Sequence, residues 1–466
     1  METYYKAHCL ILPYPIQGHI NPMLQFSKRL QNHHGIKITL AATKFLFKTL
    51  EQLQSSSSSS STSRGSLFSI ETISDGFDEG GIDSAPKLES YFKTFERVGP
   101  ETLLDLVLKL QNSGFPVDCI VYDAFLPWAV DVAKKCGITN VAAFFTQSCA
   151  VNNIYYHVYK GLLKLPLVEN EEIRIPGLPS LSSSDFPSLI AQYGSLPPIF
   201  RLVVNQFQNI EKADWVFLNT FYELENEVME WMSRILAVTS VGPTIPSMYL
   251  DKRLKEDNEY GLNMFQPMTD SCIKWLNERS ERSVVYVSFG SMAFLHPVQM
   301  EELAFGLTSS NKHFLWVVQK SEENKLPKGF LEEKTDKCLI LSWCPQLQVL
   351  AHKSIGCFIT HCGWNSTLEA LSLGVPMVAM PQWSDQTTNA KFLVDFWKTG
   401  VRARNESGIV KRDEIEKCIK QVMEGEKGKE LKINATKWKE LATKAVDEGG
   451  SSDQNIKEFV SKLLPS

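Results

Sequence analysis

The chain has 466 residues, of which 43% are hydrophobic and 22% are charged, and its formal net charge is −5. This length suits two or three domains, and the composition is that of an ordinary soluble globular protein. The charge balance lacks the basic footprint of nucleic-acid-binding domains, and no apolar run approaches the roughly 20 residues that a membrane helix needs.

The first half of the chain alternates short apolar runs with helical stretches, which is typical of an α/β fold built on a parallel sheet. Strands are predicted at residues 8–12, 36–42, 68–73, 118–122, 141–145 and 215–219, and helices at residues 21–30 and 90–111. Asn21 and Pro22 are expected to open the first helix, because proline is favoured near the first helical position. The opening strand, helix and strand form a βαβ unit, as in a doubly wound sheet.

Two stretches interrupt this alternation. Residues 55–63 are serines apart from one threonine, which predicts a surface insertion without chemistry of its own. Residues 247–266 are polar and mixed, and they are the best candidate for a linker between domains. We therefore predict a first domain over residues 1–246 and a second over residues 267–452.

The second domain repeats the α/β pattern. Its predicted strands are residues 283–288, 313–318, 337–341, 355–360 and 375–380, and its first helix starts around residues 272–276. Residues 411–450 are helical and rich in charge, and residues 453–464 form a last amphipathic helix.

A glycine turn, residues 361–365, joins a buried strand to a short helix that Gly374 ends. The start of a helix presents unpaired backbone N–H groups and a partial positive charge, which together bind phosphate. Donors surround this turn: His361, Gly363, Asn365 and Ser366. The alternative is an ordinary connection between strand and helix. However, a tryptophan, a histidine and an asparagine crowded at one buried turn cost free energy of folding unless they bind a partner such as a ligand.

Glu369 has two interpretations. Ser366 and Glu369 have the spacing of a capping box, so the carboxylate could simply cap its own helix. Alternatively, it accepts hydrogen bonds from the vicinal hydroxyls of a ribose, as acidic groups do in other nucleotide-binding folds. The local sequence alone favours the cap.

His19 and Asp123 form a candidate catalytic pair. His19 follows the first strand at a helix start, and Asp123 ends another strand of the same domain, so both point to the same rim of the sheet. The carboxylate would orient the imidazole and stabilise its protonated form, whereas the helix start disfavours that charge. Such a ring suits a general base. Taken separately, each residue could instead make only local bonds.

Several other classes of protein are disfavoured. The chain has no GxGxxG fingerprint, which weighs against an oxidoreductase that uses NAD or FAD. Cys357, His361 and Cys362 lack the paired spacing of a structural zinc site. The N-terminus lacks the apolar core of a signal peptide, so we expect a cytoplasmic protein.

Three segments carry a resemblance to a known family. Residues 343–386 run from WCPQ through HCGWNS to WSDQ, PYPIQGHINP lies near the start, and YVSFGS lies in the middle. The chain resembles the plant secondary-product UDP-glycosyltransferases over nearly its whole length, and within them the subgroup of salicylate, other carboxylate, steroid and terpenoid glucosyltransferases. The resemblance implies the GT-B architecture, in which two Rossmann-like domains face each other across a cleft. It also implies that the C-terminal helix, residues 453–466, crosses back onto the first domain, and we expect a monomer without a membrane span.

The resemblance assigns roles to individual residues. His19 and Asp123 match the catalytic dyad of the family, which favours the functional reading of both. Trp343 would stack on uracil, Cys344 and Gln346 would contact the base or ribose, and Glu369 would hold the ribose. Ser291 and the glycine turn would bind the phosphates. Contacts to sugar hydroxyls are expected from Thr146, Trp364, Asp385 and Gln386, and Gln386 is associated with glucose.

The implied reaction is an inverting displacement at the anomeric carbon of UDP-glucose, with His19 as base, giving a β-glucoside. No DxD motif occurs in the chain, so we expect no metal and no cofactor. A nucleotide-sugar binder without catalysis is disfavoured because both members of the dyad are present.

The acceptor is the least determined part of the reaction. We expect a hydroxyl of a hydrophobic phenolic, flavonoid, terpenoid or steroid, with glucose-ester formation on a carboxylic acid as the alternative. The apolar pocket candidates are Ile16, Phe125, Phe145 and Met292, and the alternative for each is core packing.

Overall fold

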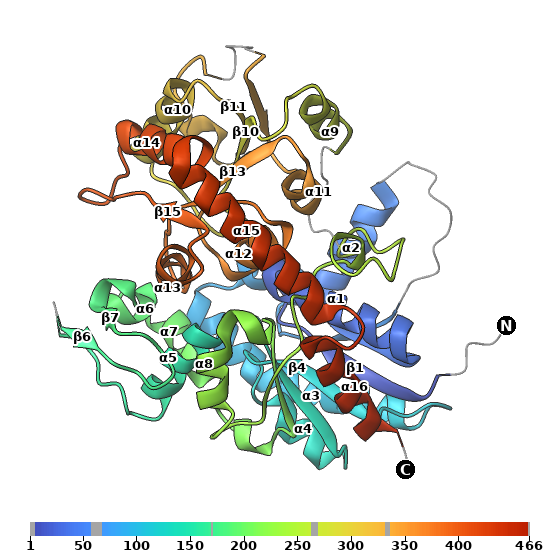
Figure 1. The fold of residues 1–466 in the computed structure, drawn as a ribbon. Coiled ribbons are helices and arrows are strands. Elements are labelled where there is room, and N and C mark those ends of the chain that lie inside the picture. Colours follow the sequence, from blue (N-terminus) through green and yellow to red (C-terminus); the bar gives the residue numbers. More distant parts are fainter. Residues whose placement is uncertain (1–4, 57–67, 169–170, 262–268, 331–335, 465–466) are drawn as a thin grey trace. The chain divides into compact units, whose positions relative to one another are not determined.

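The computed structural model describes residues 5–56, 68–168, 171–261, 269–330 and 336–464. The chain divides into two compact units, and each combines a parallel sheet with helices (Figure 1). The first unit comprises Met1–Ser183, Leu189–Met264 and Lys444–Ser466, and the second comprises Ser184–Ser188 and Phe265–Thr443. The last residues of the chain therefore belong to the first unit.

The first unit contains a seven-stranded sheet in the order β3-β2-β1-β4-β5-β8-β9, with all neighbours parallel. Its strands are β1 (Ala7–Leu12), β2 (Ile36–Thr43), β3 (Ser69–Ile73), β4 (Cys119–Asp123), β5 (Asn140–Phe145), β8 (Trp215–Leu218) and β9 (Val238–Ser240). The strand order reverses between β1 and β4. In open α/β sheets this switch point, beyond the carboxyl ends of the strands, is where ligands bind.

The helices of the first unit cover this sheet. They are α1 (Gln17–His34), α2 (Lys44–Ser56), α3 (Leu88–Gln111), α4 (Ala129–Lys135), α5 (Cys149–Tyr159), α7 (Pro197–Asn205), α8 (Tyr222–Met232) and α16 (Ser451–Leu463). The short α6 (Ser188–Ala191) has its first residue in the second unit and the others in the first, and β6 (Glu172–Ile173) and β7 (Leu181–Ser182) form an antiparallel pair.

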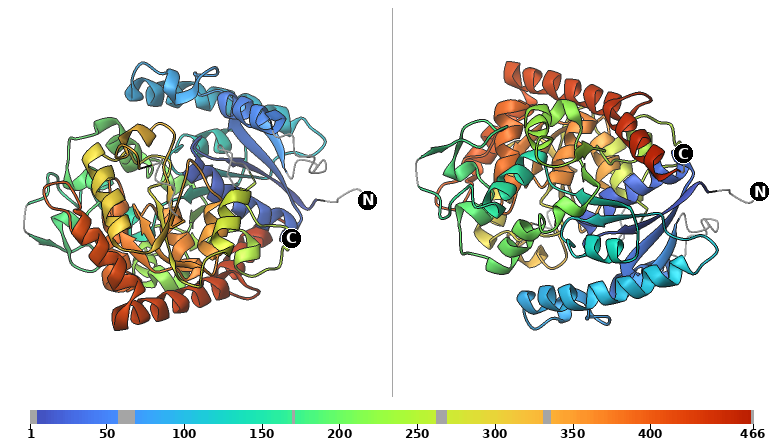
Figure 2. Two further views of the ribbon diagram at one scale, coloured as in Figure 1. Left: turned by 90° about the horizontal axis from the view of Figure 1, so that it is seen from above. Right: turned by 90° about the horizontal axis from the view of Figure 1, so that it is seen from below.

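One core of the first unit lies between the sheet and two helices that are distant in sequence. Phe26 of α1 and Phe459 of α16 are fully buried against Phe217 of β8. Figure 1 shows α16 in dark red beside α1. Figure 2 shows the long helix α3 in light blue beside the strands of the same unit.

The second unit contains a six-stranded sheet in the order β12-β11-β10-β13-β14-β15, again with parallel neighbours. Its strands are β10 (Val284–Ser288), β11 (His313–Val317), β12 (Cys338–Leu341), β13 (Ile355–Thr360), β14 (Met377–Ala379) and β15 (Gly400–Arg402). Its helices are α9 (Thr269–Asn277), α10 (Pro297–Ser309), α11 (Gln346–Ala351), α12 (Trp364–Leu373), α13 (Gln386–Lys391) and α14 (Arg412–Met423), and α15 (Gly425–Val446) follows. The switch point of this sheet lies between β10 and β13.

One predicted helix start differs from the structure, and one predicted helical stretch is resolved into its parts. α1 begins at Gln17, so Pro22 lies inside it, because the Ile16 carbonyl already accepts from the N–H groups of His19 and Ile20. A proline there removes one bond of the helical ladder. The long helical stretch from residue 411 is two helices, which Glu424 and Gly425 separate.

Two further predictions concern segments that the structure describes only in part. Residues 57–63 of the serine tract and residues 262–266 of the predicted linker lie outside the described residues. Among the helices that are described, none is both long and apolar enough to cross a membrane.

Candidate functional site

His19 and Asp123 lie together at the switch point of the first sheet. His19 is the third residue of α1, which follows β1, and Asp123 is the last residue of β4. The His19 Nδ1 atom lies 2.6 Å from Asp123 Oδ2, and the two residues are 9% and 1% exposed. A proton on Nδ1 then donates to the carboxylate and leaves Nε2 with a lone pair. The pair therefore has the geometry of a base and the carboxylate that orients it.

The surroundings of His19 hold this arrangement. The other carboxylate oxygen of Asp123 accepts from the backbone N–H of Phe125 at 2.9 Å, which fixes the carboxylate plane. The Thr146 hydroxyl lies 3.2 Å from His19 Nδ1 and 3.5 Å from Nε2. The rings of Phe125 and Tyr14 lie 4.7 and 5.7 Å from the His19 ring, centroid to centroid. In the described part of the chain, the neighbours of the imidazole thus include a carboxylate, a hydroxyl and two aromatic rings.

The glycine turn of the second unit lies at the other switch point, between β13 and α12. Gly363 is the N-cap of α12, and the residue before it, Cys362, is in the left-handed region with φ 64°. The first N–H groups of a helix have no acceptor within the helix, so Trp364, Asn365 and Ser366 start α12 as donors for an anion. Ser366 and Asn365 lie in this first turn, as predicted for a phosphate site.

His361 packs between two glycines of this region. A Cβ atom at Gly290 would lie 2.9 Å from its ring, and a Cβ atom at Gly363 would lie 2.5 Å from its Nε2. Burial lowers the pKa of His361 to about 4, while the Ser288 carbonyl acts in the opposite direction. The buried Nδ1 has no hydrogen-bond partner within the described part of the chain. A neutral imidazole has one N–H donor and one acceptor nitrogen, so His361 sits at the turn as an uncharged ring that can donate only through the nitrogen that carries the proton.

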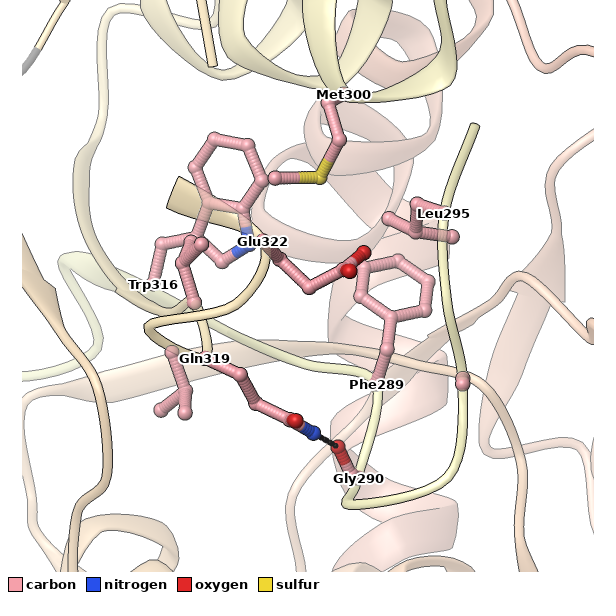
Figure 3. Close-up of a pocket in the computed structure, with 10 residues that line it drawn as sticks. Phe289, Gly290, Leu295, Met300, Trp316, Gln319 and Glu322 are labelled. Carbon is pink, nitrogen blue, oxygen red and sulfur yellow. Dashed lines mark hydrogen bonds between the residues drawn. The ribbon is translucent and has the colours of Figure 1, made fainter. Parts of the chain in front are cut away.

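The turn after β10 supports His361 from the other side. Gly290 has φ 72°, and its carbonyl accepts from the Gln319 amide at 3.1 Å, which Figure 3 shows as a dashed line. Behind the turn lies a cavity of about 30 Å³ whose lining includes Phe289, Trp316 and Glu322 (Figure 3). Sites for drug-sized ligands measure roughly 300–1,000 Å³, so this cavity is not a nucleotide site. Ser291 follows Gly290 directly at the edge of the turn.

Glu369 does not cap its own helix. The N-cap of α12 is Gly363, so Ser366 already lies within the first turn and the predicted capping box has the wrong register. Instead, Glu369 Oε2 accepts from the Gln346 side-chain amide at 2.7 Å, and the Ser366 hydroxyl accepts from the same nitrogen at 2.9 Å. Gln346 Oε1 in turn accepts from Tyr286 Oη at 2.9 Å. The structural alternative for Glu369 is therefore wrong, and a ribose-binding role remains open to it.

The residues expected around the uracil lie beside this network. The Cys344 sulfur is 3.4 Å from Tyr286 Oη and the side chain is almost fully buried, so only its main chain can meet a ligand. Trp343 precedes it and is partly exposed. Trp364, in contrast, is 3% exposed and its ring centroid lies 6.0 Å from that of Trp397. Its indole therefore belongs to the core, and a sugar contact would have to use its backbone.

Asp385 and Gln386 lie at the start of α13 and are nearly buried. Gln386 Oε1 accepts from the backbone N–H groups of Gln382 and Trp383 at 2.8 and 3.0 Å. Both lone pairs of that oxygen are used, so the amide can only donate to a ligand. Asp385 Oδ2 accepts from the Asn389 amide at 2.7 Å. An acceptor and a donor thus stand side by side, which suits vicinal hydroxyls.

The apolar acceptor candidates have different positions. The Phe125 ring lies next to the His19 ring, and the backbone carbonyl of Ile16, the N-cap of α1, accepts from the His19 N–H. Phe145 is 1% exposed and packs against Phe207, with ring centroids 5.4 Å apart, which favours core packing. Met292 belongs to the second unit and is 53% exposed.

Three supporting residues were not predicted. Tyr14 is part of the PYPIQGHINP segment, and its 4% exposed ring packs beside His19. Tyr286 donates a hydrogen bond to the Gln346 side chain, and Gln319 donates one to the Gly290 carbonyl. The motif around Tyr14 offered a signal, whereas the roles of Tyr286 and Gln319 depend on contacts between distant segments.

Comparisons with known proteins agree with this geometry. Residues 6–240 match the model of the N-terminal glycosyltransferase domain, and residues 247–440 match the model of UDP-glucuronosyl and UDP-glucosyl transferases. The chain belongs to the plant UDP-glycosyltransferase family. It is therefore a UDP-glucosyltransferase by family, and the α/β fold class and the GT-B type are confirmed.

Individual relatives place the chain within the family. It is 52% identical to UDP-glycosyltransferase 74F2 and 50% identical to the flavonol 7-O-beta-glucosyltransferase UGT74F1, both from Arabidopsis thaliana, over 98% of each chain. A crystal structure of Os79 from O. sativa in complex with UDP has a TM-score of 0.90 and 40% identity, covering 98% of this chain and 100% of that one. These relatives support glucosyl transfer.

Replacing Gly290 with alanine is expected to weaken UDP binding about tenfold or more, because the new Cβ atom displaces the His361 ring and a left-handed alanine adds strain. Gly329→Ala is the matched control, since Gly329 also has a positive φ but has no atom within 4 Å of the new Cβ. Titration calorimetry with UDP measures both. Equal affinities in the two variants would show that the position of His361 does not matter for the nucleotide.

Proposed function

We propose that this UDP-glucosyltransferase transfers glucose from UDP-glucose to a hydroxyl of a hydrophobic small molecule, with inversion, giving a β-O-glucoside. The observation that carries the proposal is the buried 2.6 Å contact between His19 and Asp123. A neutral hydroxyl is a poor nucleophile at neutral pH and needs a positioned base, and this pair provides one.

The proposed step is a single displacement. The acceptor hydroxyl gives its proton to His19 Nε2 while its oxygen forms a bond to the anomeric carbon from the face opposite UDP. The bond from that carbon to the phosphate oxygen breaks, and UDP leaves with the electron pair. Asp123 stabilises the imidazolium that forms. The start of α12, beside the uncharged His361 ring, donates hydrogen bonds to the leaving diphosphate.

Most of the residues that we propose to bind UDP-glucose belong to the second unit. Trp343 stacks on uracil, the Cys344 backbone and Gln346 contact the base or ribose, and Glu369 accepts from the ribose hydroxyls. What supports the ribose role is that Gln346 already orients the Glu369 carboxylate. Contacts to the phosphates come from Ser291 and the glycine turn. Contacts to the glucose come from Asp385, Gln386, the backbone at Trp364, and Thr146.

The preference for a hydroxyl over a carboxylate acceptor rests on the neighbours of His19. A carboxylate is already ionised at neutral pH and would be served by a cation or a row of donors. The described partners of the His19 ring are a carboxylate, a hydroxyl and aromatic rings. The amide of Gln17, the nearest candidate donor in sequence, donates to Asn21 at 2.7 Å. The flavonol 7-O-beta-glucosyltransferase from Arabidopsis, at 50% identity, supports an oxygen-linked product on a phenolic.

We expect the products of the preferred acceptors to survive mild alkaline treatment. A panel of phenols, flavonoids, steroids and aromatic acids is incubated with UDP-glucose, and each product is analysed by mass spectrometry before and after mild base. Glucose esters cleave under these conditions, whereas O-glucosides of hydroxyls survive. Base-labile products from all preferred acceptors would overturn the hydroxyl preference and support ester formation.

We further propose that the reaction needs no metal and no cofactor, that the protein is a monomer and that it is cytoplasmic. The diphosphate contacts proposed above are made by hydrogen-bond donors, and they require no bound ion.

A further inference from the structure

A short stretch of the chain, residues 184–188, belongs to the second unit although the residues on both sides of it belong to the first. We call it the clasp segment. Its backbone is bound to α13: the Thr387 hydroxyl donates to the Phe186 carbonyl at 2.6 Å, and the Thr388 hydroxyl donates to the Asp185 carbonyl at 2.7 Å. The Asp185 carboxylate also lies 3.5 Å from Lys391 Nζ. The clasp segment is thus held along the first turns of α13.

The last residue of the clasp segment, Ser188, makes two hydrogen bonds to the backbone of Ser384, one to each of the peptide groups that flank its Cα atom. Its backbone N–H donates to the Ser384 carbonyl at 2.8 Å, and its hydroxyl oxygen accepts from the Ser384 N–H at 2.7 Å. Ser384 has φ 60°, a conformation that residues other than glycine adopt rarely and only when their surroundings fix it. Ser188 supplies that fixation from outside the turn.

Ser384 directly precedes the two residues to which we assign the glucose hydroxyls, Asp385 and Gln386. Inside the same turn, Gln386 Oε1 accepts from the N–H groups of Gln382 and Trp383. The turn is therefore held by Gln386 on one side and by Ser188 on the other. A rotation of the Ser384 peptide would re-aim the Asp385 carboxylate and change the separation of acceptor and donor.

We propose that Ser188 is a positioning residue for the glucose of the donor, which it orients by fixing Ser384 and thereby the direction of Asp385 and Gln386. This inference rests on the proposed role of Asp385 and Gln386 as sugar contacts. Ser188 touches neither UDP nor glucose in this account. Its effect should fall on sugar discrimination and on the Michaelis constant for UDP-glucose, and it should leave the affinity for UDP unchanged.

The test compares Ser188→Ala with Ser188→Thr, which keeps the hydroxyl, and with Thr387→Val, which removes a different bond of the clasp segment. Steady-state kinetics with UDP-glucose and UDP-galactose give the ratio of the two kcat/KM values, and calorimetry gives the Kd of UDP. Ser188→Ala is expected to lower the glucose-to-galactose ratio about fivefold, as the loss of one hydrogen bond predicts. UDP affinity should stay at the wild-type value, and Ser188→Thr should restore the ratio.

Two outcomes would overturn the inference. One is a Ser188→Ala ratio equal to that of the wild type, and the other is an equal fall in Ser188→Ala and Thr387→Val, which would indicate that only docking of the segment matters. Gln386→Ala separates this failure from a failure of the proposed function. If Gln386→Ala also leaves the ratio unchanged, the sugar assignment itself is wrong. If it lowers the ratio while Ser188→Ala does not, only the positioning role is wrong.

Discussion

His19→Ala is expected to lower kcat for a phenolic or alcoholic acceptor about 100-fold or more, because the general base is lost. The variant should bind UDP as tightly as the wild type, since His19 belongs to the first unit and the proposed nucleotide contacts belong to the second. Single-turnover kinetics with UDP-glucose measures the first effect, and calorimetry with UDP measures the second.

Asp123→Asn is the companion variant. This substitution keeps the size of the side chain but removes its negative charge. The group that faces His19 Nδ1, now a carboxylate oxygen at 2.6 Å, becomes either an NH2 group or a neutral carbonyl oxygen. The rate should fall substantially, because the tautomer that leaves Nε2 free is no longer favoured. If His19→Ala kept more than about a tenth of kcat, a barrier change below ~1.4 kcal/mol, the base assignment would be wrong for that acceptor. Acidic acceptors, which need a base least, are the expected exception.

Glu369→Ala is expected to weaken UDP and UDP-glucose binding alike, because both ligands carry the same ribose. A hydrogen bond to a charged group contributes about 1.5–3 kcal/mol, so a loss of affinity on the order of tenfold to a hundredfold is expected. Calorimetry with each ligand measures it, and a melting curve of the same sample reports the stability.

Glu227→Ala, which removes an exposed carboxylate on α8, controls for the loss of one negative charge. Because α12 is capped at Gly363, Glu369→Ala should not show the stability loss of about 1 kcal/mol that a missing helix cap causes. Normal UDP affinity together with a lower melting temperature would contradict the ribose role.

The sequence predicted the parts of the fold that local patterns determine. Apolar runs placed strands such as β4 and β13, and a strand end next to a helix start brought Asp123 and His19 to one rim. The start of α1 was misplaced, because the Ile16 carbonyl can close a helical turn before Pro22, and no local preference reveals that. Local sequence patterns therefore do not predict a helix start that depends on a hydrogen bond to a particular backbone carbonyl.

The interpretation of Glu369 shows the same limit. Ser366 and Glu369 fit the spacing of a capping box, and only the observed cap at Gly363 shifts the register. What orients the carboxylate is Gln346, which is 23 positions away in the sequence. The hydrogen bond between Ser188 and Ser384 joins residues 196 positions apart, and no local sequence pattern predicts it. Supporting contacts of this kind come from tertiary structure, whereas the residues that meet the substrates are recognisable in short motifs.

The most direct test of the central claim is the NMR spectrum of the purified product that the wild-type enzyme forms from UDP-α-glucose and a phenol or alcohol of the acceptor panel. The coupling of the anomeric proton reports the configuration at that carbon, and its long-range correlation to carbon identifies the acceptor carbon that bears the linking oxygen. Single displacement by a hydroxyl that His19 deprotonates predicts a β-anomer linked through the hydroxyl oxygen. An α-anomer would contradict the account, because it would require retention through two displacements or another mechanism.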